Sequence, residues 1–125
     1  MSVEKVTFNN KIDKEFSKTV KTRVKEYFKE NNLSEHANAS MVFKTIILLT
    51  LYFGAYALLI SGQFSLGIMW LLCVAMGVGM AGIGFSVAHD ALHGSYSSNN
   101  KVNYVLGLTF DLMGANGYIW KITHN

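Results

Sequence analysis

A run of 45 consecutive residues without Asp, Glu, Lys or Arg, from Thr45 to His89, constrains this chain more than any other feature. About 18 apolar residues in succession already indicate a membrane helix, so the run has room for two helices and a turn. Half of all residues are hydrophobic and only 15% are charged, which argues against disorder and against nucleic-acid binding. The sequence therefore predicts an all-α integral membrane protein.

Two membrane spans are predicted, at about residues 41–60 and 64–88, joined by a turn at residues 61–63. The first span would extend about 30 Å as a helix, which matches the hydrocarbon core. Nine of the 11 Lys and Arg residues lie within residues 1–44, so the positive-inside rule places the N-terminus in the cytoplasm. The hairpin then returns the chain to the cytoplasmic side, and we expect a bacterial inner membrane.

Residues 1–40 are predicted to be a cytoplasmic segment that contains an amphipathic helix between Lys11 and Glu30. The apolar residues of this helix recur at every fourth position, at Ile12, Phe16, Val20, Val24 and Phe28. The helix either packs on the rest of the protein or lies on an anionic membrane surface, and the pattern does not distinguish the two.

The second span contains a G-x-G-x-x-G pattern from Gly77 to Gly82. Dinucleotide binding is rejected, because no strand precedes the pattern and no acidic residue lies about 20 positions downstream. Small residues spaced four apart instead favour close contact with another helix. They form two faces, with Cys73, Gly77 and Ala81 on one and Ala75 and Gly79 on the other.

His89 and His93 stand four residues apart at the end of the second span. On a helix they are separated by about 40° and about 6 Å, so both imidazoles can reach one metal ion. Imidazole suits iron, zinc and copper, and titratable groups at the mouth of a membrane helix are usually functional. Asp90 is turned about 100° from His89, which makes it a poor third ligand to the same ion. We expect it to accept a hydrogen bond from a ligating imidazole elsewhere in the site or to be a solvated charge. Gly94 is expected to end the helix in the left-handed conformation.

The segment over residues 104–120 is apolar but contains an aspartate, an asparagine and three glycines, which a lipid-facing span rarely tolerates. We interpret it as an interfacial or re-entrant helical segment, buried against protein, that returns the chain to the cytoplasmic face. His124 would then join His89 and His93 as a metal ligand. The alternative is an ordinary third span followed by a histidine without a role.

Four further side chains have ordinary interpretations. Trp70 and Trp120 are predicted to be lipid-facing or interfacial anchors. His36 lies in a polar segment and is predicted to be a surface histidine. Cys73 is the only cysteine, so it cannot form an intramolecular disulfide and is predicted to be a small packing residue.

The histidine motifs resemble those of the membrane fatty acid desaturases, an integral-membrane non-haem iron family with three histidine boxes. Residues 89–94, HDALHG, resemble the first box, H-D-x-x-H, and residues 120–125, WKITHN, resemble the opening of the second, H-N-x-x-H-H. The resemblance covers the whole chain in order. Within the family it is nearest to acyl-CoA or acyl-lipid desaturases of the front-end, linoleoyl-type branch.

The resemblance implies the O2-dependent introduction of a double bond into a fatty acyl chain at a di-iron centre with eight or nine histidine ligands. His89, His93 and His124 match ligand positions of the family. Residues 41–125 would then be the N-terminal part of a desaturase domain, truncated within the second box. Because three imidazoles cannot hold two irons as the family does, we expect this chain to be inactive by itself.

The implied partners are an acyl-CoA or acyl-lipid substrate, O2, membrane lipid and a separate electron donor of ferredoxin or cytochrome type. Some relatives carry a fused cytochrome domain with an H-P-G-G motif, whereas this chain has no proline, so we expect the donor to be separate. Two alternatives remain open. One is a histidine-box membrane hydroxylase, which inserts oxygen with the same metal, and the other is a small non-enzymatic membrane hairpin protein with incidental histidines.

Overall fold

The computed structural model describes residues 10–124, with side chains from residue 14 onward, and every regular element in this range is a helix. Residues 1–9 and Asn125, which supplies the asparagine of the second histidine motif, lie outside the described residues. The chain divides into two compact units, Met1–Glu35 and His36–Asn125. The prediction of an all-α protein is confirmed.

The first unit contains α1, Asn10–Glu30, which matches the predicted amphipathic helix. Asn32 has a φ of +51°, and the N–H groups of Asn32 and Leu33 donate to the carbonyls of Lys29 and Phe28 at 3.2 and 2.9 Å. These two bonds form a Schellman motif, with asparagine in the left-handed position that glycine usually holds. The helix therefore ends through local hydrogen bonding within its own unit.

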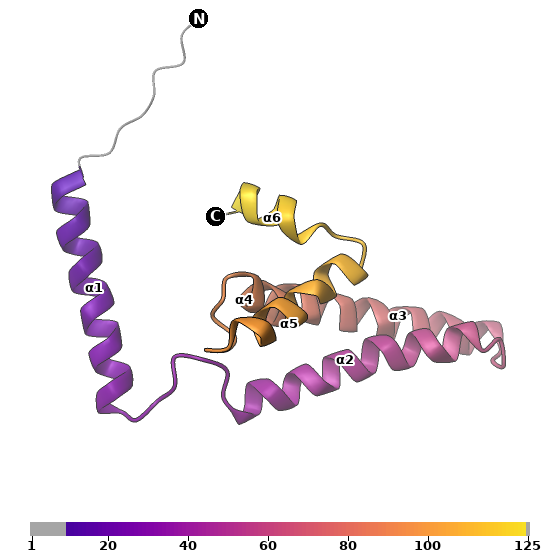
Figure 1. Ribbon diagram of the computed structural model, residues 1–125. Helices are drawn as coiled ribbons and strands as arrows, with labels where there is room; N and C mark the ends of the chain where they lie inside the picture. Colours follow the sequence, from indigo (N-terminus) through magenta and orange to yellow (C-terminus); the bar gives the residue numbers. More distant parts are fainter. Residues whose placement is uncertain (1–9, 125) are drawn as a thin grey trace, which may run out of the picture. The chain divides into compact units, whose positions relative to one another are not determined.

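The second unit is built on a helical hairpin (Figure 1). α2, Ala39–Ile60, is followed by a turn in which Gly62 has a φ of +65°, and then by α3, Leu66–Gly82. α3 continues through a π-helix, η1, Ile83–Ala88, into α4, His89–Leu92, and together they form one helix of 27 residues. The predicted hairpin is confirmed, and its second helix continues past the predicted span to Leu92, so that it includes His89.

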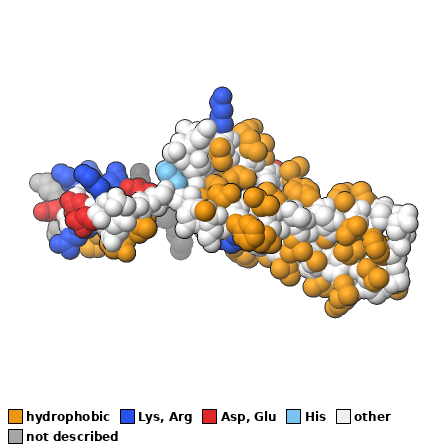
Figure 2. Space-filling model, turned by 90° about the horizontal axis from the view of Figure 1, so that it is seen from below, with side chains coloured by type: hydrophobic (Ala, Val, Ile, Leu, Met, Phe, Trp, Pro, Cys, Tyr) orange, Lys and Arg blue, Asp and Glu red, His pale blue; other side chains and the backbone are white. Residues whose placement is uncertain are grey.

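Both hairpin helices are long and apolar enough to cross a membrane, and only 11% of the apolar window of each is buried inside the protein. A core helix of a soluble protein would be mostly buried, whereas hydrophobic side chains here cover the outside of the hairpin (Figure 2). Trp70 is exposed, in keeping with the predicted anchor. Cys73 is also exposed, so it is not the packing residue that the sequence predicted.

The two hairpin helices approach most closely at Gly79 of α3. A Cβ atom on Gly79 would lie 3.0 Å from the backbone nitrogen of Tyr52 and 3.2 Å from its Cα. A Cβ atom on Gly82 would meet the side chain of Leu48. Only one of the two predicted small-residue faces therefore forms the interface, because a Cβ atom on Gly77 would meet nothing within 4 Å.

The buried core lies at the end of the hairpin, around η1. Its buried hydrophobic residues are Ile83, Val87, Ala88, Ala91 and Tyr96. Directly before the π-helix, the carbonyl of Gly82 accepts a hydrogen bond from the hydroxyl of Ser86 at 2.6 Å. The sequence analysis missed the π-helix, because a continuous apolar run has no periodicity from which its helical pitch could be inferred.

Two short helices follow the hairpin, where a single element was predicted over residues 104–120. α5, Asn100–Leu112, packs on η1 and α4, and α6, Gly117–His124, follows a turn in which Gly114 has a φ of +86° (Figure 1). At about 20 and 12 Å, neither helix is long enough to cross a membrane. The described residues thus contain no third span, and the segment returns to the hairpin end as predicted.

Replacing Gly79 with alanine should destabilise the hairpin, because the new Cβ would press on backbone atoms of Tyr52 that cannot move aside. We expect the free energy of unfolding to fall by about 1–3 kcal/mol. The matched control is Gly77→Ala on the open side, where alanine favours the helix by about 0.5–1 kcal/mol. Unfolding in detergent micelles, followed by circular dichroism, measures both, and equal stabilities would contradict the close approach.

Candidate metal centre

Three histidines converge at the end of the hairpin. His89 begins α4, His93 follows its last residue, and His124 ends α6; their ligand nitrogens all lie within 4.8 Å of one another. The ring centroids are 4.6 Å apart for His89 and His93, and the His124 centroid lies 5.6 and 5.5 Å from these two. His89 is half-buried and the other two are exposed. The structure thus brings together the three residues predicted to be metal ligands.

A Schellman motif ends the helix directly after His93. Gly94 has a φ of +73°, and the N–H groups of Gly94 and Ser95 donate to the carbonyls of Ala91 and Asp90, both at 2.9 Å. A side chain with a Cβ is strained at this φ, which explains the glycine. The predicted end of the helix at Gly94 is confirmed, and the chain changes direction directly after His93.

Hydrogen bonds connect the loop after α4 to the start of the hairpin and to the residues just before it. Tyr96 is buried, its hydroxyl lies 2.8 Å from the Thr45 hydroxyl of α2, and its carbonyl accepts a hydrogen bond from the Ala37 N–H at 3.0 Å. His36 is exposed, as predicted, and its Nδ1 lies 3.0 Å from the carbonyl oxygen of Ser95. His36 therefore contacts the loop and is not part of the histidine cluster.

Asn103 connects the same loop to α5 through hydrogen bonds. This side chain is buried, and its Oδ1 accepts a hydrogen bond from the Ser97 N–H at 2.9 Å. Its Nδ2 donates to the carbonyls of Ser97 at 2.7 Å and Gly94 at 3.2 Å. One side-chain amide thus provides hydrogen-bond partners for three backbone groups of the loop. Buried polar groups need such partners, because water cannot reach them.

Polar residues between the two short helices position α6. The Asp111 Oδ1 accepts a hydrogen bond from the Gly117 N–H at 3.1 Å, and the Asn116 Oδ1 accepts one from the Ile119 N–H at 2.9 Å. These bonds satisfy N–H groups in the first turn of α6. A Cβ atom on Gly117 would lie 3.3 Å from Leu92 Cδ2, so α6 packs closely on α4. The residues that argued against a lipid-facing span therefore hold the helix that carries His124.

Trp120 packs against the histidine cluster, which the sequence analysis missed. Its ring is stacked on that of His124, with a centroid distance of 4.3 Å and an interplanar angle of 25°. Its centroid also lies 5.3 Å from His89, 5.1 Å from His93 and 5.9 Å from Phe110. The lipid-facing alternative of the prediction is wrong, because residues four apart share a helix face and the face of His124 turns toward α4.

Asp90 pairs with the histidine next to it in the chain. Its Oδ1 lies 3.2 Å from the Nδ1 of His89, and both side chains are partly exposed. A carboxylate at this position can accept a hydrogen bond from Nδ1–H and leave Nε2 for a metal. The partner of Asp90 is thus the neighbouring His89, and not a ligating imidazole elsewhere in the site as predicted.

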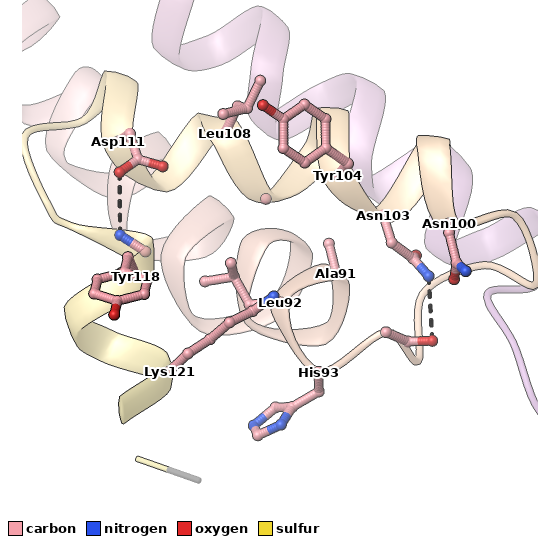
Figure 3. A pocket seen from close by; sticks show the side chains of 13 residues that line it. Ala91, Leu92, His93, Asn100, Asn103, Tyr104, Leu108, Asp111, Tyr118 and Lys121 are labelled. Carbon is pink, nitrogen blue, oxygen red and sulfur yellow. Dashed lines mark hydrogen bonds between the residues drawn. The ribbon is translucent and has the colours of Figure 1, made fainter. Parts of the chain in front are cut away.

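A groove with a volume of about 550 Å³ lies beside the cluster, between α4, α5 and α6 (Figure 3). His93 and Lys121 lie along one side of this groove, and Tyr104 and Leu108 lie along the opposite side. The remaining lining residues are Ala91, Leu92, Gly94, Asn100, Asn103, Gly107, Asp111, Gly117 and Tyr118. The cluster therefore has one side packed by Trp120 and one side that adjoins an accessible groove.

Three imidazoles in this arrangement form a donor set for a transition metal. Nitrogen donors suit iron, zinc and copper, whereas magnesium and calcium prefer oxygen. Three protein ligands leave further coordination positions open, as in metal sites that bind a reactant. The geometry is therefore compatible with a catalytic metal as well as with a larger ligand set.

Comparisons with curated proteins connect this histidine pattern to a family. The chain is 37% identical over 124 residues to an sn-1 linoleoyl-lipid 6-desaturase of Arthrospira platensis, covering 99% of this chain and 33% of the relative. It is 34% identical over 125 residues to an sn-1 linoleoyl-lipid 6-desaturase of Synechocystis sp., covering 100% of this chain and 34% of the relative. An acyl-lipid (8-3)-desaturase of Physcomitrium patens is 32% identical over 112 residues, covering 90% and 23%. The chain belongs to the membrane fatty acid desaturase family.

The family resemblance of the histidine motifs is thereby confirmed. The desaturase chain spans about a third of the length of the first two curated relatives. No family model matches it, and no solved structure matches it.

Replacing Asn103 with leucine should loosen the loop that follows α4, because three backbone groups lose their partner. We expect the free energy of unfolding to fall by about 1–3 kcal/mol and the Ser97 amide to exchange its hydrogen at least about tenfold faster. The matched control is Asn100→Leu on the same helix, where the side chain is exposed. Hydrogen exchange followed by mass spectrometry compares the two, and an unchanged Ser97 rate in N103L would refute this role.

Proposed function

We propose that this desaturase chain supplies His89, His93 and His124 as iron ligands for an enzyme that introduces a double bond into a fatty acyl chain. The observation that most supports this proposal is the return of His124. It follows His93 by 31 residues, yet α6 brings its imidazole to within 4.8 Å of the other two ligand atoms. Incidental histidines on a small hairpin protein have no physical reason to converge in this way.

Iron fits the donor set, and its chemistry fits the reaction. An unactivated methylene has neither an acidic proton nor an electrophilic carbon, so side-chain acid and base groups cannot remove its hydrogens. Iron, when bound, would supply the oxygen activation that this reaction requires. The three imidazoles would then be part of the larger histidine set of a di-iron centre.

Two neighbouring side chains would prepare the histidines for this role. Asp90 would hold the proton of His89 on Nδ1 and so direct Nε2 toward the metal. Trp120 would pack against all three imidazoles and keep water from that side of the cluster. These are positioning roles, because neither side chain would touch the reacting carbon.

The position of the cluster suits a substrate that resides in lipid. The acyl tail of a membrane lipid lies in the hydrocarbon layer, and the cluster stands at the end of a hairpin with an apolar exterior. The relatives are named linoleoyl-lipid and acyl-lipid desaturases, which favours an acyl-lipid over an acyl-CoA substrate. O2 and a separate electron donor of ferredoxin or cytochrome type would complete the reaction.

We place the cluster on the cytoplasmic side of a bacterial inner membrane. The hydrogen bond between Tyr96 and Thr45 joins the loop after α4 to the beginning of α2, so the cluster shares one side of the hairpin with the chain that precedes it. That preceding chain carries eight of the 11 basic residues and a ninth, Lys44, lies near the beginning of α2, which favours the cytoplasm. The cyanobacterial sources of two relatives support a bacterial membrane.

Metal binding tests the ligand set without any need for activity. The purified chain in detergent micelles should bind Co(II), a coloured probe, and H89A, H93A and H124A should each weaken binding by at least about 100-fold. Asp90→Asn should weaken Co(II) binding less, by about 10- to 100-fold, as is usual for a residue that hydrogen-bonds to a metal ligand. Titration followed by visible absorption measures these affinities.

The chain offers a matched control in its fourth histidine. H36Q should bind Co(II) as the unmodified chain does, because His36 contacts the loop after α4 and lies outside the cluster. Equal binding by H124A and the unmodified chain would remove His124 from the site. Equal loss in H36Q and H124A would mean that the histidines act only through folding.

The reaction itself can be tested in a chimera. This chain would replace the matching third of the Arthrospira platensis relative, and the fatty acids of a host that lacks this enzyme would be analysed by gas chromatography and mass spectrometry. We expect the chimera to introduce a double bond, and its H124A variant to lose at least about 100-fold of that activity. The chimera with H36Q should remain active.

The outcomes separate the competing functions. A chimera that accumulates in the membrane but forms no double bond would contradict the proposed function. A hydroxylated fatty acid as the main product would favour the hydroxylase instead. An active chimera whose H89A, H93A and H124A variants remain active would leave the histidines without a catalytic role.

A further inference from the structure

The first unit presents a continuous apolar surface on α1. Four-residue steps advance about 40° around a helix, so Phe16, Val20, Val24 and Phe28 form an arc of about 120°, and Tyr27 falls inside it. Between positions 16 and 28 the arc contains no charged residue, and Ser17 is its only polar residue; Asp13 lies on the same side one turn earlier. Phe16 is 70% exposed and Val24 is 47% exposed, so these side chains are not buried within the first unit. In Figure 2 the hydrophobic side chains of this helix gather on one side.

Basic side chains border the apolar arc on both edges. By the same geometry, Lys21 lies about 20° beyond Phe28, and Arg23 lies about 20° beyond Phe16. Lys21 belongs to a row of five lysines within about 80°, formed by Lys14, Lys18, Lys21, Lys25 and Lys29. Glu15 and Glu26 lie farther around the helix, beyond the lysine row, and Glu30 lies about 20° beyond Arg23. Long basic side chains beside an apolar face can reach anionic headgroups while the face enters the lipid.

The chain itself keeps α1 near a membrane. Eight residues, 31–38, separate α1 from α2, the first helix able to span a bilayer. Fully extended, they reach at most about 28 Å. Because the hairpin tethers α1 to the membrane, the lipid surface is present at a high effective concentration. A separate protein would have to be recruited from solution.

The spacing of the apolar residues also favours a flat surface over a partner helix. A coiled coil needs a repeat of 3.5 residues, which keeps a narrow seam in line. Steps of four residues drift by about 40° each and spread the apolar side chains over a broad face. A broad face is what a helix needs to lie in the plane of a membrane interface.

We propose that α1 docks on the anionic headgroups of the membrane that its own hairpin spans, with Phe16 to Phe28 in the lipid and the lysine row at its surface. The helix thus acts as an interfacial anchor beside the first span. The proposal depends on the hairpin being in a membrane and is independent of metal binding and of desaturation.

Single labels in the full chain test this docking. Cys73 is the only cysteine, so Cys73→Ala provides a background into which Val20→Cys, Val24→Cys and Thr22→Cys can be introduced one at a time. Thr22 lies opposite the centre of the apolar arc and is uncharged, which makes it the matched control. Each variant, labelled with an environment-sensitive fluorophore, is reconstituted into phosphatidylcholine vesicles with and without 30% phosphatidylglycerol, about a typical anionic content.

In the anionic vesicles we expect spin-labelled lipids to quench the labels at positions 20 and 24 at least about threefold more than the label at position 22. Acrylamide in the water should show the opposite order. High salt, neutral vesicles, or K18Q combined with K25Q should each reduce the lipid quenching, and E15Q combined with E26Q should not. The folded hairpin is monitored by circular dichroism in every sample.

Two results would overturn the proposal. Equal quenching at all three positions in anionic vesicles would show that α1 is not docked through its apolar arc. Protection from acrylamide without quenching by lipid, unchanged by salt and by lipid charge, would show that α1 packs on protein instead.

Discussion

The absence of charge over 45 residues determines the rest of this structure, because a helix in lipid must satisfy its backbone within itself. A run of this length exceeds one crossing, so the chain has to reverse, and Gly62 with its φ of +65° lies in the turn. The reversal brings the second helix back to the level at which α2 begins. Tyr96 and Thr45, which are 51 positions apart, can therefore share a hydrogen bond, and the histidines of α4 emerge beside the start of the hairpin.

Polar residues then confine the chain beyond the hairpin to one path. Asn103 satisfies the loop after α4, and Asp111 satisfies the first turn of α6. Among the described residues, no buried side-chain nitrogen or oxygen lacks a hydrogen-bond partner. An unsatisfied buried polar group costs about 1–3 kcal/mol, so alternative paths that break these bonds are disfavoured. The return of His124 to α4 follows from bonds made by residues that have no part in metal binding.

The sequence predicted those parts of the structure that depend on composition and on short spacings. The hairpin followed from the uncharged run, the end of α4 from Gly94, and the paired imidazoles of His89 and His93 from their four-residue spacing. The division into α5 and α6 was missed, although Gly114 marks it, because the apolar residues continue across the turn. The contact of Trp120 with the histidines was missed because residue type alone suggests a membrane anchor, whereas its position four residues before His124 places both on one helix face.

The π-helix explains why both histidines of α4 face away from the core. Gly79, Ile83, Val87 and Ala91 are all buried and follow one another at steps of four. In an α-helix each such step overshoots a turn by about 40°, so Ala91 would drift by about 120° from the line of Gly79. The π-helix, Ile83–Ala88, takes more residues per turn, which offsets part of this drift and helps to keep the later side chains on the core side. His89 and His93 lie two positions on either side of Ala91, about 200° around the helix, and therefore point to the side where α6 presents His124.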